Sequence, residues 1–180
     1  MGQTDASFLN ERRGGEPGHA ARRWVEIDLE RQKLVVLEGA TPRAEFPVST
    51  ALAGAGEREG SLCTPRGWHC VRAKIGAGTA LGTVFVGRRP TGEIYSPQLG
   101  ERYRDRDWIL TRILWLSGLE KGRNRFGAVD TMRRYIYIHG CPDEVPLGVP
   151  GSKGCVRMHG AALIELFDAL PAGARVLIHE

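Results

Sequence analysis

The 180-residue chain has no long apolar run, since no stretch of about 18 consecutive apolar residues occurs in it. No membrane-spanning helix is therefore expected. Residues 1–23 (MGQTDASFLNERRGGEPGHAARR) also lack the apolar segment of about 7–15 residues that a secretory signal needs. Their polar, Gly- and Arg-rich composition predicts a disordered tail. It favours a cytoplasmic protein, with a periplasmic one as the alternative.

The sequence has no strong charge excess, because 25 Lys and Arg are set against 21 Asp and Glu, giving a net charge of +4. Nucleic-acid binding needs a concentrated basic surface, whereas the basic stretches 102–106 and 123–134 are interrupted by Asp. No nucleic-acid partner is expected. These stretches are interpreted as solvated surface, with a basic rim for an anionic substrate as the alternative.

Cysteine is scarce, and the spacing of the four residues, Cys63, Cys70, Cys141 and Cys155, fits no zinc motif. No metal is expected. Free thiols are the expectation for a reducing compartment, and a Cys63–Cys70 disulfide across the intervening turn is the alternative. A Cys141–Cys155 disulfide that inactivates the protein on oxidation is a further hypothesis.

Aromatic residues make up only 7% of the chain, while 24 glycines predict many turns between short elements. Alternating or β-branched patterns predict strands over residues 23–29, 33–38, 44–50, 68–74, 108–116, 135–138 and 175–178. Residues 160–170 predict the main helix, because their apolar residues recur at helical spacing before Pro171. The pattern indicates a mainly β, sandwich-like domain with one main helix, which follows Cys155.

The most informative motif pairs a histidine with a cysteine. His139 follows an apolar strand, and Cys155 lies sixteen positions later in the turn Gly151-Ser152-Lys153-Gly154-Cys155-Val156-Arg157-Met158. A thiol nucleophile needs a nearby base, and a histidine with a pKa near ~6.5 suits that task. The glycines allow a tight turn with exposed amides, so Gly154 and Cys155 are expected to form an oxyanion hole for acyl transfer.

These motifs resemble the L,D-transpeptidase family, also called the YkuD-type catalytic domain. The family pattern is His-Gly, a loop, and then Ser/Thr-His-Gly-Cys-Ile/Val-Arg/Asn. His139-Gly140 and residues 152–157 match it, with fifteen residues between His139 and Cys155. The segments Thr64-Pro65-Arg66-Gly67-Trp68 and 174–178 resemble two further family elements. The resemblance covers residues 24–180 and implies one catalytic domain, in which two mixed sheets pack together and the site lies at their edge under a loop.

The expected catalytic set is Cys155, His139, Gly140 and Gly154. Cys155 is the nucleophile and His139 is the general base. The resemblance implies that the carbonyl of Gly140 orients the imidazole in place of a third triad member. A packed structural thiol and a plain strand terminus are the alternative interpretations of Cys155 and His139.

The expected substrate-binding set is Arg157, Ser152 and Lys153. The planar guanidinium of Arg157 suits a substrate carboxylate, with a surface ion pair as the alternative. Ser152 is expected to brace the loop through backbone hydrogen bonds. Lys153 departs from the family, which has histidine here, and a charged lysine cannot accept a hydrogen bond. It can still supply positive charge to a thiolate or an oxyanion.

The resemblance implies peptidoglycan stem peptides or muropeptides as substrates, a thioester intermediate, no cofactor and acylation of Cys155 by carbapenems. The expected activity is an L,D-carboxypeptidase that removes D-alanine from stem tetrapeptides during muropeptide recycling. The alternative is an L,D-transpeptidase that forms 3–3 cross-links. A further alternative is an inactive domain that binds peptidoglycan fragments, suggested by Lys153. Residues 116–130 are the expected cover of the site.

Overall fold

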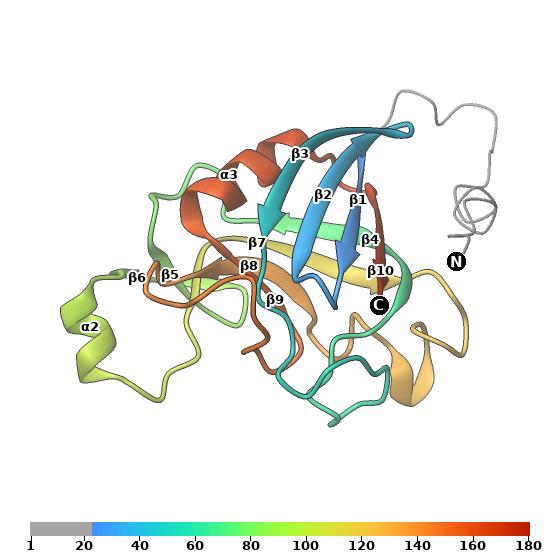
Figure 1. The fold of residues 1–180 in the computed structure, drawn as a ribbon. Helices are drawn as coiled ribbons and strands as arrows, with labels where there is room; N and C mark the ends of the chain where they lie inside the picture. Colours follow the sequence, from blue (N-terminus) through green and yellow to red (C-terminus); the bar gives the residue numbers. More distant parts are fainter. Residues whose placement is uncertain (1–22) are drawn as a thin grey trace, which may run out of the picture.

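Most of the chain forms short strands joined by turns, as its composition predicts. The computed structural model describes residues 23–180 (Figure 1). The predicted tail, residues 1–23, lies outside this part except for Arg23, which begins the first strand. The strands are β1 (Arg23–Asp28), β2 (Lys33–Glu38), β3 (Thr41–Pro47), β4 (Gly67–Ile75), β5 (Thr83–Val86), β6 (Arg89–Ile94), β7 (Ile109–Gly118), β8 (Tyr137–Cys141), β9 (Val156–His159) and β10 (Arg175–His179).

Within residues 23–180, the helical elements are α2 (Pro97–Arg102), the 3-10 turn η1 (Gly127–Val129) and the main helix α3 (Gly160–Ala169). Within residues 23–180, no helix combines the length and the apolar character needed to cross a membrane. The mainly β class with one main helix after Cys155 is confirmed.

The strands join in one mixed sheet of ten strands that curls so that two parts face each other (Figure 1). The order is β3-β2-β1-β10-β4-β7-β5-β6, with β8 on β7 and β9 on β8. The pairs β1–β10 and β8–β9 are parallel, and the other pairs are antiparallel. The long β7 links the two parts because it pairs with β4, β5 and β8.

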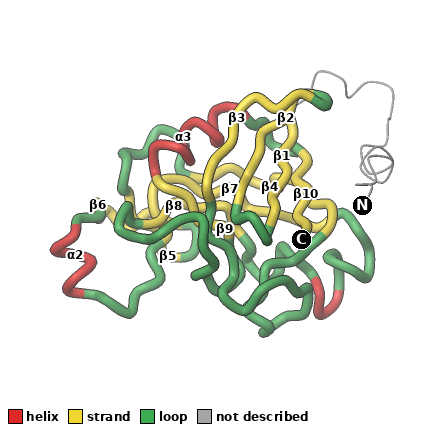
Figure 2. The backbone as a smooth tube through the Cα atoms, in the orientation of Figure 1, coloured by secondary structure: helices red, strands yellow, loops and turns green. Residues whose placement is uncertain are grey.

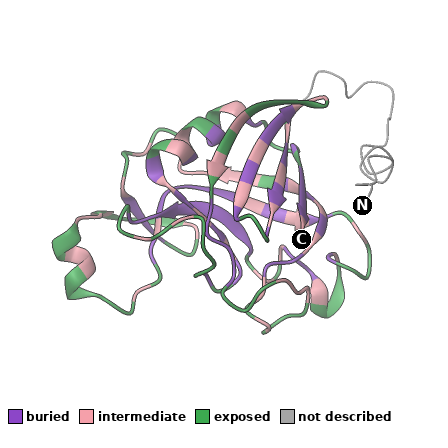
Figure 3. Ribbon diagram, viewed as in Figure 1, coloured by how far each residue is buried: buried purple, intermediate pink, exposed green. Residues whose placement is uncertain are grey.

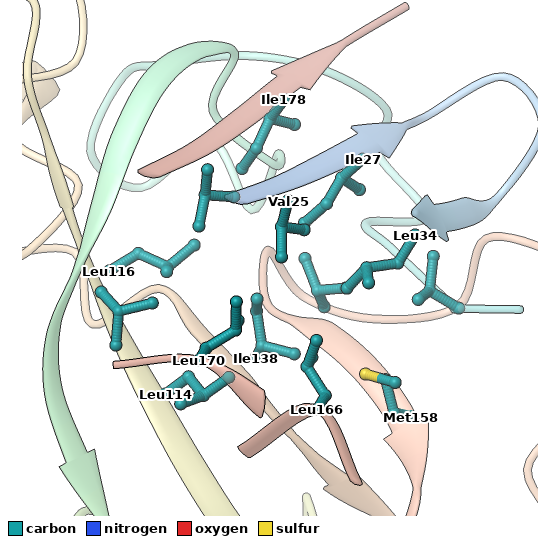
Figure 4. Close-up of a cluster of buried hydrophobic side chains, with 14 of the residues drawn as sticks. Val25, Ile27, Leu34, Leu114, Leu116, Ile138, Met158, Leu166, Leu170 and Ile178 are labelled. Carbon is teal, nitrogen blue, oxygen red and sulfur yellow. The ribbon is translucent and has the colours of Figure 1, made fainter. Parts of the chain in front are cut away.

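The core fills the space between the curled part of the sheet and α3. Its largest buried side chains come from both parts of the sheet, including Ile27, Leu114, Ile138 and Ile178 (Figure 4). The apolar stripe of α3 packs on β7, β8 and β9, so β7 and β8 are buried along most of their length (Figure 3). Each fully buried Leu or Ile adds roughly 1.5–3 kcal/mol to stability. This core makes a rigid base for the loops.

The long loops gather at one side of the sheet (Figure 2). Residues 48–66, after β3, lie between the turn that carries Cys155 and residues 119–135. Ser49 exchanges backbone hydrogen bonds with Arg157 at 3.0 and 2.9 Å, and Leu52 donates to the carbonyl of Ser152 at 2.9 Å. The loop after β3 is therefore the support on which the cysteine turn rests.

Two strand predictions shift, each for a local reason. The strand predicted at 44–50 is β3, which begins at Thr41 and ends at Pro47. The strand predicted at 135–138 begins only at Tyr137, because Tyr135 has a positive φ of 57° that breaks the extended backbone. His139 therefore lies inside β8 rather than after it. The short elements β5, β6, β9 and α2 carried no clear periodic signal.

Candidate active site

Cys155 lies at the end of the turn that leads into β9. Its Sγ accepts a hydrogen bond from the amide of Tyr137 at 3.4 Å and donates to the carbonyl of Tyr135 at 3.5 Å. The side chain packs against the buried cluster of Phe85, Ile113 and Tyr137. Burial raises the pKa of the Cys155 thiol to about 11, although the Tyr137 amide favours the thiolate. The resting group at neutral pH is therefore the thiol.

His139 shares a face with Cys155. In β9, Val156 and Met158 join Ile138 in the core, so the alternate positions Cys155 and Arg157 lie on the opposite face. His139 lies on that face as well, in register with Arg157. The strand pairing thus places the imidazole and the thiol on one surface of two adjacent strands.

The tautomer of His139 follows from its hydrogen bond. Nδ1 lies 2.9 Å from the carbonyl of Gly140, which can only accept, so Nδ1 carries the proton. Nε2 is left with its lone pair as the basic atom. Burial lowers the pKa of His139, which keeps the imidazole neutral at pH 7. The structure thus gives Gly140 the orienting carbonyl that the resemblance implied.

A thiol with a raised pKa beside a neutral imidazole predicts a distinctive pH dependence of alkylation. Deprotonation of Cys155 rises tenfold per pH unit below its pKa, so its reaction with iodoacetamide should rise by about tenfold per unit from pH 7 to 9. Mass spectrometry of the Cys155 peptide measures this rate separately from those of the other thiols. A rate that stays level across this range would show a thiolate–imidazolium pair instead.

The turn before Cys155 is fixed by two polar side chains, Ser152 and Thr64. Ser152 Oγ donates to the carbonyl of Cys155 at 2.5 Å and accepts from the amide of Gly154 at 3.2 Å. Thr64 Oγ1 donates to the carbonyl of Gly154 and accepts from the amide of Ala51, both at 3.0 Å. Gly154 has a φ of +125°, which side chains rarely adopt. Ser152 therefore braces the turn and is buried.

These contacts involve the Gly154 amide, which was expected to serve the oxyanion. That amide already donates to Ser152 Oγ, because the positive φ of Gly154 turns it into the loop. The Cys155 amide is the other donor of this turn that was expected to serve the oxyanion. Gly154 contributes through its conformation.

Steric crowding also explains why residue 140 is glycine, besides the orienting role of its carbonyl. A Cβ at this position would lie 2.4 Å from the carbonyl oxygen of Leu110, on the neighbouring strand β7. The backbone approaches closely there because β7 is irregular between Leu110 and Ile113. Only glycine therefore fits beside His139.

Replacing Gly140 by alanine should lower the free energy of unfolding by about 3 kcal/mol, because strand backbone must move to admit the methyl group. Urea denaturation measures the change. Gly122→Ala is the control, since it has open space and only a positive φ of 77°, and should cost about 1 kcal/mol. Equal losses in the two variants would contradict the steric argument.

Arg157 and Lys153 line a cavity of about 270 Å³. Its wall also includes Asp107 and Cys141. Arg157 Nη2 donates to Asp107 Oδ1 at 2.6 Å, and Nη1 donates to the carbonyl of Gly151 at 3.1 Å. The ion pair that was the alternative for Arg157 is therefore formed in this structure. A substrate carboxylate at Arg157 would therefore share the guanidinium with Asp107 or compete with it.

The cysteines are all free thiols. The proposed Cys141–Cys155 disulfide is wrong, because Cys141 is in register with His159 at the far end of β8. Cys155 lies beside Tyr137, four residues away along the strand, or roughly 13 Å. A disulfide needs Cα atoms within about 7 Å. Across residues 23–180, no group of three or more His, Cys, Asp or Glu side chains is arranged to hold a metal.

Sequence reasoning missed three contributors to the site. Asp107 lies in a mixed-charge stretch that was interpreted as solvated surface. The Tyr137 amide carries no side-chain signal. Arg134 fixes the loop next to the cysteine turn by donating to the carbonyls of Gly56, Glu57 and Cys63 at 2.6–3.1 Å. All three contacts join segments that are distant in sequence.

The expected cover, residues 116–130, lies against the loop before β4. Leu119 donates to the carbonyl of Trp68, Glu59 donates to that of Ala128, and the Asn124 side chain bonds to the carbonyls of Arg66 and Trp68. The turn between β5 and β6 reaches Tyr137, the residue whose amide bonds to the cysteine sulfur, because Arg88 donates to the Tyr137 hydroxyl at 3.0 Å.

The comparison with protein families decides the assignment. The sequence model of the YkuD family, described as the L,D-transpeptidase catalytic domain, matches residues 22–178. The chain belongs to this family. Two Bacillus subtilis proteins named as L,D-transpeptidases, YqjB and YkuD, are 43% identical over 53 residues and 39% identical over 56 residues. These matches cover 29% and 30% of this chain and only 30% and 34% of the relatives.

Solved L,D-transpeptidases share the fold of this chain at low sequence identity. The enzyme from Xylanimonas cellulosilytica has a TM-score of 0.52 at 22% identity, over 99% of this chain and 70% of that one. L,D-transpeptidase 3 from Mycobacterium tuberculosis, solved with a faropenem-derived adduct, has a TM-score of 0.54 at 14% identity, over 88% and 61%. LdtMt1, solved with imipenem, has a TM-score of 0.52 at 16% identity, over 87% and 58%.

Proposed function

We propose that this chain cleaves the L,D peptide bond between diaminopimelate and the terminal D-alanine of peptidoglycan stem tetrapeptides, as an L,D-carboxypeptidase of muropeptide recycling in the cytoplasm. The observation that carries the proposal is the pairing of Cys155 with a neutral, Nδ1-protonated His139 on one face of β8 and β9. That pair suits acyl transfer through a thioester. Membership of the L,D-transpeptidase family supports the bond that is attacked.

The reaction follows from the two side chains. Cys155 Sγ attacks the carbonyl carbon of diaminopimelate while His139 Nε2 takes the thiol proton. The oxyanion receives a hydrogen bond from the Cys155 amide. When the C–N bond breaks, the imidazolium gives its proton to the departing D-alanine amine. Water then attacks the thioester with His139 again as base, and the tripeptide leaves as Cys155 recovers its proton.

The charges near the thiol support water as the acceptor. Within residues 23–180, the cations Arg134 and Arg157 act on Cys155, and the anion that acts on it, Asp107, is paired with Arg157. An ammonium group that approached the thioester would meet net positive charge, whereas water would not. An amine acceptor, and hence 3–3 cross-linking, is therefore the second outcome to be measured.

The test is to incubate the purified protein with a disaccharide-tetrapeptide and to analyse products by mass spectrometry, beside a Cys155→Ala control. Loss of one alanine only in the unchanged protein would support the proposal. Dimers with a 3–3 linkage would replace it with transpeptidation and a periplasmic place of action. If a carbapenem acylates Cys155 but no peptide product forms, the proposed substrate is wrong. If neither occurs, a binding domain is the better interpretation.

A further inference from the structure

A cluster of aromatic rings with one arginine lies directly beside Cys155. Arg88, in the turn between β5 and β6, has its guanidinium carbon 4.3 Å from the ring centre of Trp115 and 5.3 Å from that of Tyr135. Trp115 and Tyr135 are stacked with centres 6.3 Å apart, and Tyr137 meets Trp115 edge-on at 6.1 Å. The reaction proposed above uses none of these side chains.

The cluster is held in place yet open to solvent. Arg88 Nη1 donates to the Tyr137 hydroxyl at 3.0 Å, and Trp115 Nε1 donates to the carbonyl of Met132 at 3.2 Å. Tyr135 is nevertheless 56% exposed. Its positive φ of 57° is a strained conformation for a bulky residue, and it sets the ring at the surface. The exposed ring of Tyr135 and the half-buried ring of Trp115, beside a held guanidinium, form a preorganised binding surface.

Arg88 differs from Arg157 in its charge partner. Arg157 is paired with Asp107 at 2.6 Å. No Asp or Glu of the described part of the chain lies within ion-pair distance of Arg88. The remaining donors of its guanidinium are therefore available to an anion. Arg88 is better placed than Arg157 to receive a carboxylate without displacing a protein group.

The distance between Arg88 and the thiol can be compared with the length of the diaminopimelate side chain. The same two residues that hold the cysteine sulfur, Tyr135 and Tyr137, carry the rings that contact Arg88 or bond to it. Arg88 is therefore about one tyrosine side chain from Cys155. In the donor peptide, the side-chain carboxylate of diaminopimelate is separated from the attacked carbonyl by a short aliphatic chain. That chain can lie on the rings of Trp115 and Tyr135.

We propose that Arg88 binds the side-chain carboxylate of the diaminopimelate in the acyl donor, with Trp115 and Tyr135 as the surface for its aliphatic chain. This inference rests on the proposed function. It makes Arg88 a residue that selects for diaminopimelate over lysine at the third position of the stem peptide, because lysine has the same chain without the carboxylate.

The test compares two stem tetrapeptides, one with diaminopimelate and one with lysine, in the unchanged protein and in Arg88→Gln. Glutamine keeps a donor for the Tyr137 hydroxyl but removes the charge. We expect kcat/KM for the diaminopimelate peptide to fall by about tenfold to a hundredfold, mostly through KM, since a charge-assisted pair is lost. The lysine peptide should change less than about threefold. Arg88→Lys should recover part of the loss.

Arg89→Gln is the matched control, because Arg89 is exposed on β6, next in sequence to Arg88, and should leave both peptides unchanged. A third substrate in the same experiment is a diaminopimelate peptide that is amidated at the D-glutamate carboxylate. If that amidation alone removes the effect of Arg88→Gln, Arg88 binds the other carboxylate and the proposal is overturned. Equal losses on both peptides would mean that Arg88 only supports Tyr137, and would overturn it too.

The outcomes separate this inference from the proposed function. If the unchanged protein releases D-alanine from the diaminopimelate peptide but Arg88→Gln does so equally well, only the role of Arg88 is wrong. If the unchanged protein releases no D-alanine from either peptide while a carbapenem still acylates Cys155, the proposed function is wrong. The inference falls with it.

Discussion

Replacing Cys155 by alanine should reduce kcat/KM for D-alanine release by at least about 10⁴-fold and abolish the mass increase caused by a carbapenem. No other group on the active face can form the covalent intermediate. His139 is held as a base, and Cys141 lies at the far end of β8, with its thiol pKa raised to about 12 by burial. Without the sulfur, the Cys155 amide alone can stabilise an oxyanion, which accounts for any residual rate.

The fold should survive this substitution, because the cysteine sulfur makes only two long hydrogen bonds, both to backbone. A circular dichroism melt similar to that of the unchanged protein checks this point. Cys155→Ser adds a second test, since a hydroxyl with its far higher pKa should give little turnover but can still bind substrate. Carbapenem labelling that persists in Cys155→Ala would assign the nucleophile to another residue.

Replacing His139 by glutamine should lower kcat/KM by about 10²–10⁴-fold, the range expected when a general base is removed. The unchanged protein should lose activity only below about pH 6.5, because burial lowers the histidine pKa and the base stays neutral above it. The variant should not show this fall in activity at low pH, the acidic limb of the profile. Its residual activity should instead rise with pH as the Cys155 thiol ionises. Rates measured from pH 5 to 9 separate the two profiles.

His159→Gln is the control for His139, since His159 is a half-buried histidine on β9 whose Nε2 lies 3.0 Å from the carbonyl of Val145. It should keep both the rate and the acidic limb. If His159→Gln rather than His139→Gln removed the limb, the base would be misassigned.

The candidate pair could be proposed from sequence because both residues lie in recognisable local patterns. Cys155 lies in a glycine-containing turn, and His139 follows an apolar run of residues, so residue types and spacing suggest a nucleophile and a base. The contact that orients the imidazole, between His139 Nδ1 and the carbonyl of Gly140, also joins adjacent residues. The main helix was predictable because its apolar stripe needs no partner to be recognised.

The remaining parts of the site depend on contacts that spacing cannot reveal. The occupied amide of Gly154 depends on its φ of +125° and on the position of Ser152 Oγ. The Arg157–Asp107 pair joins residues 50 positions apart. The positive φ of Tyr135 shifts the start of β8 and exposes a ring that a strand would have packed. Backbone conformation and tertiary pairing decide each of these.

The position of β10 in the sheet has a consequence for synthesis of the protein. This last strand lies between β1 and β4, so it alone connects the hairpins of β1–β3 to β4 along the sheet. During translation the first three strands leave the ribosome early but must wait for residues 175–179 before the sheet can close. The loop after β3 that supports the cysteine turn is anchored to that early hairpin. A nascent chain would therefore hold an unassembled nucleophile until residues 175–179 have been made.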